Sequence, residues 1–442
     1  MKVEFHAIAA GGDAVGHDDS GRVIFASHAA PGDVAEVVVK TEHHSFARGR
    51  VINLLSPSPQ RVASPCEYYL PDASGDLTTA CGGCQLQHLS YAAQLEAKAN
   101  IVRDALRRIA GIGEPNVAPC VPSPLPFHYR NKADFVVTQD DAGIRIGFCA
   151  PNSHHTIDVA HCPIQQPANN ALLAAVRDCV QAGLAPPFEP ASGRGVLRRI
   201  VARTAANGET LVTAVTTRAA WPQAAEFAAR LRAAVPSLMG VLRRKPQQAA
   251  RVISGRDWLE ENVAGLRLRV GGDSFFQINT SLTPMLVGTA LRLAKIEPRQ
   301  RSLDLFCGVG LFALAMARQG ASVLGIETSR QAVRQAVLNA RQNGLKAEFR
   351  SGDAARELRN LAADEWDVVV LDPPRAGAKE CITELARLRP RRIVYVSCDP
   401  ATLARDVKLL GAHEYCLREA VPLDLFPQTA HVEVVAKLEK IR

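Results

Sequence analysis

One cysteine of this chain occupies a position from which it could act as a nucleophile. Cys398 follows the apolar, β-branched run Val394–Ser397 and precedes Pro400 and a helical pattern. In an open α/β sheet, the carboxyl end of such a strand faces the crevice in which ligands bind. A strand tip exposes the sulfur, and a following helix N-terminus favours the thiolate. A buried packing role is the more common fate of a free cysteine, so both interpretations stay open on this segment alone.

Acidic residues end three consecutive predicted strands in the same half of the chain. The strand before them, 302–306, leads into Cys307–Gly310, whose glycines let the backbone approach a ligand, although a lone Gly-x-Gly is weak evidence. Glu327, roughly 20 residues further on, can accept both hydroxyls of a ribose, and Asp353 and Asp372 follow it. These acids suit a cofactor with a ribose, an adenine and a cationic centre, namely S-adenosylmethionine, whereas they would repel a pyrophosphate. Helix capping explains any one of them but poorly explains all three in order.

A carboxylate near the end of the chain could serve as a general base. Glu433 stands at the start of the last predicted strand, after Ala430 and His431. If Cys398 attacks a substrate, a second reactive group is needed, and a carboxylate can remove a carbon-bound proton. Taken alone, Glu433 is more simply explained as a charge on an edge strand.

Four other cysteines have the spacing of a metal site. Cys66 is followed by Cys81 and Cys84, which are separated by two glycines, and then by Cys162. A C-x-x-C bend brings two thiolates within reach of one metal, and its glycines permit the tight turn. Four thiolates fit either a [4Fe–4S] cluster or zinc, and spacing alone does not choose between them. The remaining cysteines are predicted to be structural, namely Cys120, Cys149, Cys179, Cys307, Cys381 and Cys416.

The composition is that of an ordinary globular protein. The chain has 442 residues, 47% of them hydrophobic and 22% charged, which indicates two or three domains. Met1–His6 is broken by charge and lacks a signal-peptide apolar region, and the apolar runs elsewhere are too short to span a bilayer. Eleven cysteines, an odd number, do not indicate a disulfide framework. We therefore expect a cytoplasmic monomer that does not associate with membranes.

The predicted elements divide the chain into three parts. Residues 1–56 are short strands separated by Gly and Pro turns, which predicts a small β-barrel. Residues 57–265 are irregular, bear the four cysteines and contain a clear helix at 91–110, expected to pack on the catalytic domain. Residues 266–442 alternate between strands and helices, which predicts a parallel, doubly wound, Rossmann-like α/β sheet. Its strands are predicted at 302–306, 321–327, 347–349, 366–372 and 392–397, and its helices at 311–317 and 329–343.

Positive charge is concentrated in one segment. The formal net charge is +8, and residues 194–256 carry twelve Lys or Arg against only Glu209 and Glu226. That local excess favours phosphate binding over a solvated face. The twelve are Arg194, Arg198, Arg199, Arg203, Arg218, Arg230, Arg232, Arg243, Arg244, Lys245, Arg251 and Arg256. The barrel, with five basic and seven acidic residues, gives no such indication.

Five ordered segments together resemble the RNA uracil-C5 methyltransferases that use S-adenosylmethionine. They are Phe275–Asn279, Asp304–Gly310, Leu371–Gly377, Val396–Arg405 and Asp424–Glu433. The N-terminal part resembles the OB-like TRAM module of the branch that acts on 23S ribosomal RNA. The resemblance covers nearly the whole chain, most weakly over 165–265. It implies a class I methyltransferase domain preceded by that barrel and by a central iron–sulfur-bearing α+β domain.

The resemblance also implies a covalent mechanism on RNA. Cys398 would add to C6 of a flipped-out uridine, so that C5 becomes nucleophilic enough to accept the methyl group. Glu433 would then remove the C5 proton, and the thiolate would leave. The positions that match cofactor contacts of the family are Gln277, Phe306, Glu327, Asp353 and Asp372.

Three features of this chain depart from the family pattern. Leu311 replaces a polar or small residue, so that cofactor contact is not carried over. Asp399 replaces the more usual Asn, and its charge should oppose formation of the Cys398 thiolate unless it is paired. The run Cys-Gly-Gly-Cys-Gln-x-Gln-His matches the cluster motif of the family and favours iron–sulfur. Fourteen residues separate Cys66 from Cys81, where the family usually has about five, as in a loop insertion.

Parts of the sequence are also compatible with three other functions. A tRNA-directed enzyme of the same family is possible, but that branch generally lacks both the TRAM module and the cluster. A catalytically silent RNA-binding iron–sulfur protein would not need an intact Cys398 and Glu433. An amino-methyltransferase, which Asp372–Arg375 resembles, would not need Cys398.

Overall fold

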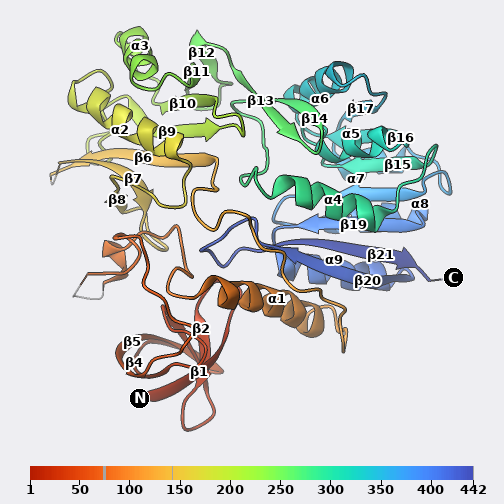
Figure 1. Cartoon of the computed structure of the whole chain (residues 1–442), viewed down its shortest axis with the longest axis horizontal. Coiled ribbons are helices and arrows are strands. Elements are labelled where there is room, and N and C mark those ends of the chain that lie inside the picture. The colour runs from red at the N-terminus through yellow and green to blue at the C-terminus, as the bar shows by residue number, and fades with distance from the viewer. Residues whose placement is uncertain (73–75, 142, 442) are drawn as a thin grey trace.

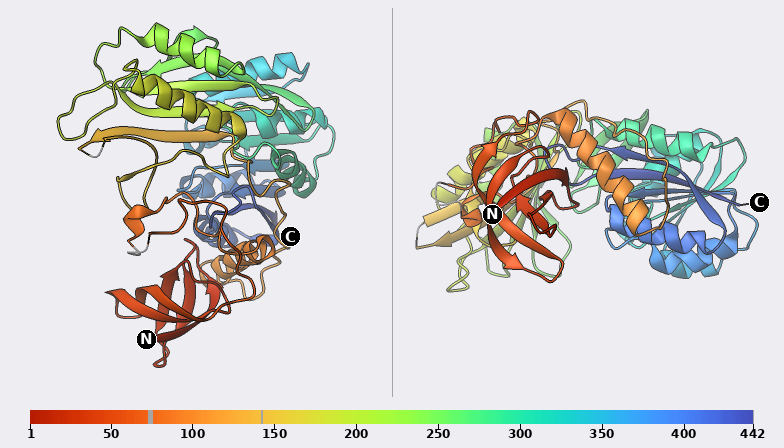
Figure 2. Two further views of the ribbon diagram at one scale, coloured as in Figure 1. Left: turned by 60° about the vertical axis from the view of Figure 1, so that its left-hand side comes forward. Right: turned by 90° about the horizontal axis from the view of Figure 1, so that it is seen from below.

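The computed structural model describes residues 1–72, 76–141 and 143–441. A barrel, a central sheet and an α/β domain follow one another along the chain, and the helix α1 (Tyr91–Arg108) runs beside the barrel and the α/β domain (Figure 1). The barrel stands at one end of the molecule (Figure 2, left). Over the described residues, no helix combines the length and the apolar character needed to cross a membrane.

The N-terminal strands close into a barrel, as predicted. In β1, Val3, Phe5 and Ile8 are buried while Lys2 and Glu4 are exposed, because side chains alternate between the two faces of a strand. Pairing of β1 with β4 closes the ring, in the order β1-β2-β3-β5-β4. The strands are β1 (Lys2–Ile8), β2 (Ala14–His17), β3 (Val23–Ser27), β4 (Val34–Glu42) and β5 (Phe46–Ser56).

The central part is a sheet in the order β12-β11-β10-β9-β6-β7-β8, on which two helices pack. The helices α2 (Pro167–Gln181) and α3 (Ala224–Ala234) contact each other as well as the sheet (Figure 1). The strands are β6 (Lys132–Asp140), β7 (Gly143–Cys149), β8 (Thr156–Asp158), β9 (Leu197–Thr204), β10 (Thr210–Thr216), β11 (Leu238–Arg244) and β12 (Arg251–Gly255). A short 3-10 helix, η1 (Leu77–Thr79), lies in the segment before α1.

A hairpin spans residue 265, where the sequence predicts a domain boundary. β13 (Trp258–Val263) pairs antiparallel with β14 (Leu266–Gly271). Val263 and Leu266 are both buried in the hydrophobic core of the α/β domain. Leu259 of the same hairpin is buried with Leu211 and Leu242 of the central sheet, so the hairpin packs on both parts.

The C-terminal sheet has the strand order β17-β16-β15-β18-β19-β21-β20. The predicted elements are confirmed to within two residues. The strands are β15 (Arg301–Leu305), β16 (Ser322–Glu327), β17 (Glu348–Ser351), β18 (Val368–Leu371), β19 (Arg392–Ser397), β20 (Tyr415–Leu423) and β21 (Glu433–Lys440). The helices are α4 (Thr283–Ala294), α5 (Leu311–Arg318), α6 (Arg330–Gln342), α7 (Ala354–Arg359), the 3-10 helix η2 (Lys379–Cys381), α8 (Ile382–Leu388) and α9 (Pro400–Gly411).

The five strands predicted between residues 302 and 397 are parallel, as expected, but the strand that begins at Glu433 runs in the opposite direction. β15 to β19 are parallel, but β21 pairs antiparallel with both β19 and β20. The loop 424–432 joins β20 directly to β21 and contains no helix, and a parallel pair needs a longer crossover connection. As a result, the first residue of β21 lies at the same sheet edge as the last residues of the parallel strands.

Helix α1 packs on two cores at once. Ala93, Ala97 and Ile101 are buried in the barrel core, whereas Val102 and Leu106 are buried in the core of the α/β domain. The helix begins at Ser90, whose side-chain oxygen accepts a hydrogen bond from the N–H of Ala93 at 3.3 Å, a favourable N-cap.

Candidate active site

The catalytic candidates gather at the carboxyl edge of the C-terminal sheet. Phe306 directly follows β15, Glu327 ends β16, Asp372 directly follows β18 and Cys398 directly follows β19. These strands are parallel, so their ends meet at one edge, the edge at which open α/β sheets bind ligands.

Strand register sets Glu433 beside Cys398. β19 and β21 pair antiparallel, and the last pair of that ladder is Ser397 with Val434. Continuing the register by one residue places Cys398 opposite Glu433, because antiparallel partners move in opposite directions. The predicted nucleophile and the predicted base thus come from adjacent strands.

The surroundings of Cys398 disfavour its thiolate in the absence of a ligand. Burial raises the pKa of the Cys398 thiol to about 11, and the carboxylates of Glu433 and Asp372 add to the rise. The guanidinium of Arg375 acts in the opposite direction. A ligand that brings positive charge to this edge would therefore favour the reactive form of the cysteine.

The two carboxyl groups beside Cys398 hold a proton more tightly than ordinary carboxyl groups. Burial, and then the charge of Asp372, raise the pKa of Glu433 well above its usual range. Burial also raises the pKa of Asp372 to about 7, although a hydrogen bond donated by the Gln277 amide at 3.2 Å opposes that rise. Glu433 is 2% exposed, and its Oε1 has no hydrogen-bond partner among the described residues. Such a carboxylate is suited to accept a proton from carbon.

The negative charge of Asp399 is used to cap helix α9. Its carboxylate caps α9 by accepting a hydrogen bond from the N–H of Thr402 at 2.8 Å. A helix N-terminus stabilises that negative charge, and Asp and Asn cap helices about equally well. This explains structurally why an aspartate can follow Cys398.

Arg375 is a functional candidate that the sequence analysis did not single out. It is exposed, and its charge lowers the pKa of Cys398. Burial lowers the pKa of His431 to about 4, and the charge of Arg375 adds to this decrease. The motif Asp372–Arg375 contains this arginine, but nothing in the motif predicts which groups it faces.

The turn after β15 fits a cofactor with a ribose and a cationic centre. Glu327 accepts hydrogen bonds from the N–H groups of Gly308 at 3.2 Å and Ser329 at 2.8 Å, which fixes its carboxylate at the turn. A Cβ added to Gly308 would meet no atom within 4 Å, so the space over the turn is open. Buried Asp304 adds a side-chain oxygen without a partner in the described structure. The Glu327 carboxylate would attract a sulfonium and repel a phosphate, whereas burial raises the pKa of Asp304 and favours its neutral form.

The other predicted cofactor residues have mixed surroundings. Phe306 has a left-handed backbone (φ 62°) at the turn and packs against the core. Asp353 caps α7 by accepting a hydrogen bond from the N–H of Arg356 at 3.0 Å, so helix capping accounts for one of its oxygens. Its neighbour Gly352 donates to the carbonyl of Glu327 at 3.0 Å, which keeps the two strand ends together. Leu311 is buried in the core, in keeping with an apolar residue there.

The structure brings the four predicted metal ligands into one neighbourhood. Burial raises the pKa of Cys81 to about 12, and Cys162, Cys66 and Cys149 are among the groups that add to the rise. Burial also raises the pKa of Cys162 to about 11 and that of Cys66. Cys66 therefore joins the others despite the insertion, and Cys149, predicted to be structural, lies close to them.

The cysteines have the donor chemistry of a metal site, but they are not arranged as one. No three His, Cys, Asp or Glu side chains in residues 1–72, 76–141 and 143–441 have the spacing of a metal site. Gln87 hydrogen-bonds toward Cys66 and Cys84, which lowers the pKa of each thiol against the larger effect of burial. The backbone of Cys162 is fixed by both side-chain groups of Asn170, at 3.0 and 3.1 Å. The thiols therefore match a thiolate-binding group in donor chemistry but not in their present spacing.

The basic segment divides into surface and interior residues. Arg198 lies over Phe188 at 4.3 Å, and together with Arg199, Arg244 and Lys245 it lines a cavity of about 330 Å³. Arg199 is paired with Asp134 and Arg244 with Asp273. In this cavity, the positive charge is thus partly balanced.

Arg203, in contrast, cannot contact RNA. It is 2% exposed and donates a hydrogen bond to the carbonyl of Ser274 at 2.8 Å. The expectation that it belongs to a phosphate-binding face is therefore wrong. β9 is buried continuously from Ile200 to Thr204, on both faces, so an arginine in this part of the strand is buried whichever way it points.

Comparison with known proteins gives a consistent picture. Residues 90–441 match the family model described as tRNA (Uracil-5-)-methyltransferase. An uncharacterized RNA methyltransferase of Gloeobacter violaceus is 36% identical over 454 residues, covering 100% of this chain and 96% of that relative. One from Nitratidesulfovibrio vulgaris is 38% identical over 459 residues, covering 99% and 95%.

A solved structure matches over the same extent. The tRNA (uracil-54, C5)-methyltransferase of Pyrococcus abyssi, in complex with S-adenosyl-L-homocysteine, superposes with a TM-score of 0.75 at 28% identity. The match covers 99% of this chain and 100% of that one. With the cysteine, the base and the acidic strand ends at one sheet edge, these matches lead to one conclusion. The chain belongs to the tRNA (uracil-5-)-methyltransferase family of S-adenosylmethionine-dependent RNA methyltransferases.

Proposed function

We propose that this RNA uracil-C5 methyltransferase works through a covalent adduct between Cys398 and C6 of a uridine, with Glu433 as the general base. The observation that carries the proposal is the register that sets Cys398 opposite Glu433, beside Asp372. C5 of uracil is too weak a nucleophile to be methylated directly, so a reversible addition at C6 is needed first.

Each bond change has a group in place. The Cys398 sulfur forms a bond to C6, and the C5–C6 π electrons move toward O4 to give an enolate. Gln277, Phe306, Glu327, Asp353 and Asp372 would hold S-adenosylmethionine, whose sulfonium would supply the methyl group: a C5–CH3 bond would form as the S–CH3 bond breaks, leaving S-adenosylhomocysteine. Glu433 then takes the C5 proton, the C5–C6 double bond re-forms, and the sulfur leaves with its electron pair. Arg375 favours the thiolate at the start and at the end of this cycle.

We further propose that Cys66, Cys81, Cys84 and Cys162 hold a [4Fe–4S] cluster, with zinc as the alternative. Support comes from the mutual influence of the thiols and from the two glycines between Cys81 and Cys84. Raised thiol pKa values make the free thiols neutral, so a bound cation would be needed to stabilise four thiolates here.

The proposed target is 23S ribosomal RNA, and the division into a TRAM-like barrel (1–56), a cluster-bearing domain (57–265) and a catalytic domain (266–442) is part of that proposal. The cysteine group supports it, whereas the barrel does not separate the two targets, because the match to a tRNA methyltransferase covers 99% of this chain and so includes the barrel. Transfer RNA is the second candidate, because the Pyrococcus abyssi relative is a tRNA (uracil-54, C5)-methyltransferase that matches the entire chain. Mapping of 5-methyluridine in ribosomal and transfer RNA from a deletion strain separates the two targets.

The RNA would approach the sheet edge as a flipped-out nucleotide. Phe275, two residues before Gln277, is 68% exposed and offers a ring on which a base can stack. Arg198 and Lys245, at the cavity of the central sheet, offer positive charge for phosphates. Binding at these points would offset the cost of removing the uridine from its stack.

A further inference from the structure

The loop that carries Glu433 into the site is fixed at one strained residue. Residues 424–432 join β20 to β21 and lead directly into Glu433, so their conformation acts on its placement together with the register of β21. Gln428, in the middle of this loop, has a left-handed backbone (φ 70°) and is 3% exposed. A non-glycine residue keeps such a conformation only where its surroundings impose it.

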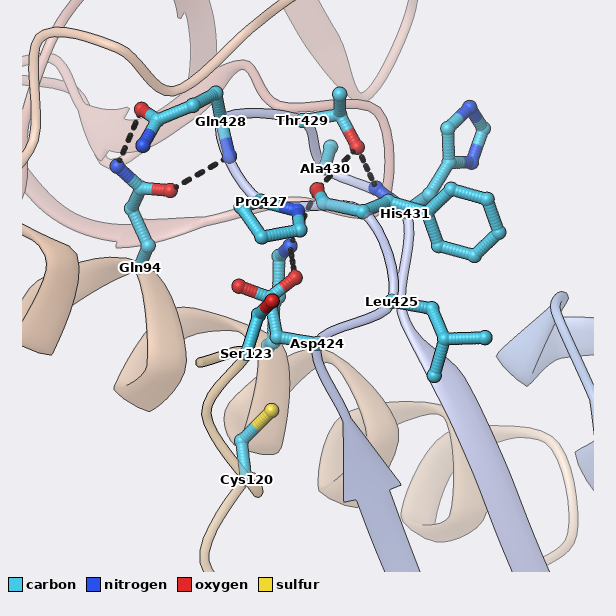
Figure 3. A network of polar contacts seen from close by, with 12 residues as sticks. Gln94, Cys120, Ser123, Asp424, Leu425, Pro427, Gln428, Thr429, Ala430 and His431 are labelled. Atoms are coloured by element: carbon cyan, nitrogen blue, oxygen red, sulfur yellow. Dashed lines mark hydrogen bonds and ion pairs between the residues drawn. The ribbon is translucent and has the colours of Figure 1, made fainter. Parts of the chain in front are cut away.

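The surroundings of Gln428 engage every polar group that it has. Its N–H donates to the Gln94 side chain at 3.0 Å, and its Oε1 accepts from the Gln94 amide at 3.0 Å (Figure 3). Its Nε2 donates to the carbonyl of Pro126 at 3.3 Å. Its carbonyl accepts from the N–H groups of Gln85 at 3.1 Å and Leu86 at 3.0 Å. Gln94 belongs to α1, but Gln85 directly follows the cysteine pair.

The side chain of Gln85 makes a second link between the same two segments. Its Nε2 donates to the carbonyl of Gly82 at 3.0 Å, and its Oε1 accepts from the N–H of Ala430 at 3.3 Å. Gly82 lies between Cys81 and Cys84, and Ala430 is three residues before Glu433. One amide side chain therefore bridges the cysteine turn and the loop that places the base.

The barrel closes over this bridge. A Cβ added at Gly12 would lie 2.5 Å from the Cβ of Gln85 and 3.3 Å from the Cβ of Ala430. Gly12 itself has φ 94°, which favours glycine. The bridge is thus packed against a third segment and has little room to move aside.

We propose that Gln85 is a positioning residue for Glu433, through which the state of the four cysteines determines the placement of the base. The proposal rests on the proposed function in taking Glu433 as the base. A loaded, rigid cysteine turn holds Gly82, Gln85 holds Ala430 and Gln428, and Glu433 starts its strand opposite Cys398. When the turn is loosened, the addition of Cys398 can proceed but removal of the C5 proton slows.

Gln85→Ala in the full-length, anaerobically purified enzyme tests this role. We expect it to keep its metal, to keep KM for RNA, and to lower kcat by about tenfold to a hundredfold, because small misplacements of a catalytic group cost that much. The specific signature is a protein–RNA adduct that survives denaturing gels and carries the transferred methyl group. Loss of kcat without the adduct, or a change confined to KM, would overturn the proposal.

Gln342→Ala is the matched control. Gln342, on α6, also donates a hydrogen bond from its side-chain amide, to Glu260 of β13 at 3.2 Å, and contacts neither the cysteine turn nor the loop 424–432 through it. We expect no adduct to accumulate in this variant, and an equal amount in both variants would contradict a specific role of Gln85. Cys81→Ser, which should lose the metal, is expected to accumulate the adduct, and turnover of that metal-free protein without it would also contradict the proposal.

A parallel measurement on Glu433→Gln distinguishes a failure of the positioning role of Gln85 from a failure of the assignment of Glu433 as the base. If Glu433→Gln traps the adduct while Gln85→Ala does not, the positioning role is wrong and the proposed function stands. If Glu433→Gln traps nothing, the assignment of the base is wrong, and the positioning role falls with it.

Discussion

Cys398 and Glu433 lie opposite each other across β19 and β21, one step beyond the pair of Ser397 with Val434. The antiparallel direction of β21 is what makes this possible. In a parallel arrangement, the first residue of that strand would lie at the far edge of the sheet, away from Cys398. The proposed chemistry thus depends on β21, the strand whose direction departs from the parallel pattern of β15 to β19.

Replacement of Cys398 by alanine should remove methyl transfer while leaving cofactor binding intact. The covalent step is lost, and nucleophile knockouts lower kcat by a factor on the order of 10⁴ or more. Transfer of a labelled methyl group and equilibrium binding of S-adenosylhomocysteine measure the two effects. Cys416→Ala, in β20, is the control and should turn over normally. Near-normal turnover of Cys398→Ala would remove the nucleophile assignment.

Replacement of Glu433 by glutamine should trap the reaction after methylation. Addition and methyl transfer precede proton removal, so a covalent protein–RNA species that resists denaturing gels should accumulate. Mass spectrometry should locate it on the Cys398 peptide, with the methyl group present. The absence of any such species with good substrate would count against Glu433 as the base.

Charges around Cys398 should shift the pH at which its thiol reacts. Burial raises its pKa to about 11, Glu433 adds to that rise, and Arg375 opposes it. Removal of the negative charge in Glu433→Gln should move the alkylation midpoint of Cys398 to lower pH, and Arg375→Gln should move it to higher pH. Iodoacetamide labelling across a pH series, read on the Cys398 peptide, measures both. Shifts of the same sign in the two variants would contradict this electrostatic account.

Protein purified without oxygen should be brown and carry about four iron atoms per chain, as expected for four thiolates around one cubane. Cys81→Ser and Cys84→Ser should lose the metal. Cys66→Ser is the weakest case, because its segment contains the insertion. Elemental analysis and the absorption spectrum distinguish an iron–sulfur cluster from zinc. One equivalent of zinc without iron would show that the site binds zinc instead.

Charge reversal at the cavity of the central sheet should weaken RNA binding. Arg198→Glu with Lys245→Glu should reduce the slope of log K against log salt by about one unit for each phosphate that the variant no longer neutralises. Cofactor affinity should not change, since neither residue is among those predicted to hold the cofactor. Arg230→Glu, exposed on α3 and outside the cavity lining, is the control. Unchanged binding in the double variant would move the RNA surface elsewhere.

The sequence was sufficient where local pattern decides structure. Continuous apolar runs predicted the parallel strands, and motif order predicted which strand ends carry Glu327, Asp372 and Cys398. The direction of β21 was not predictable in the same way, because an apolar run looks alike in a parallel and an antiparallel neighbour. Arg203 was wrongly predicted to lie on an RNA-binding surface for a related reason, since only the tertiary fold shows that it faces Ser274. The role of Arg375 required knowledge of which charges share one edge.

Helix α1 connects the barrel to the stability of the α/β domain. Ala93, Ala97 and Ile101 face the barrel from the same helix whose other side enters the catalytic core. The region that matches the family begins at residue 90, so a chain trimmed to that region would show this small apolar stripe to water. The barrel therefore acts as a cover for the enzyme as well as a separate module. A different module in place of the barrel would have to cover Ala93, Ala97 and Ile101 as well.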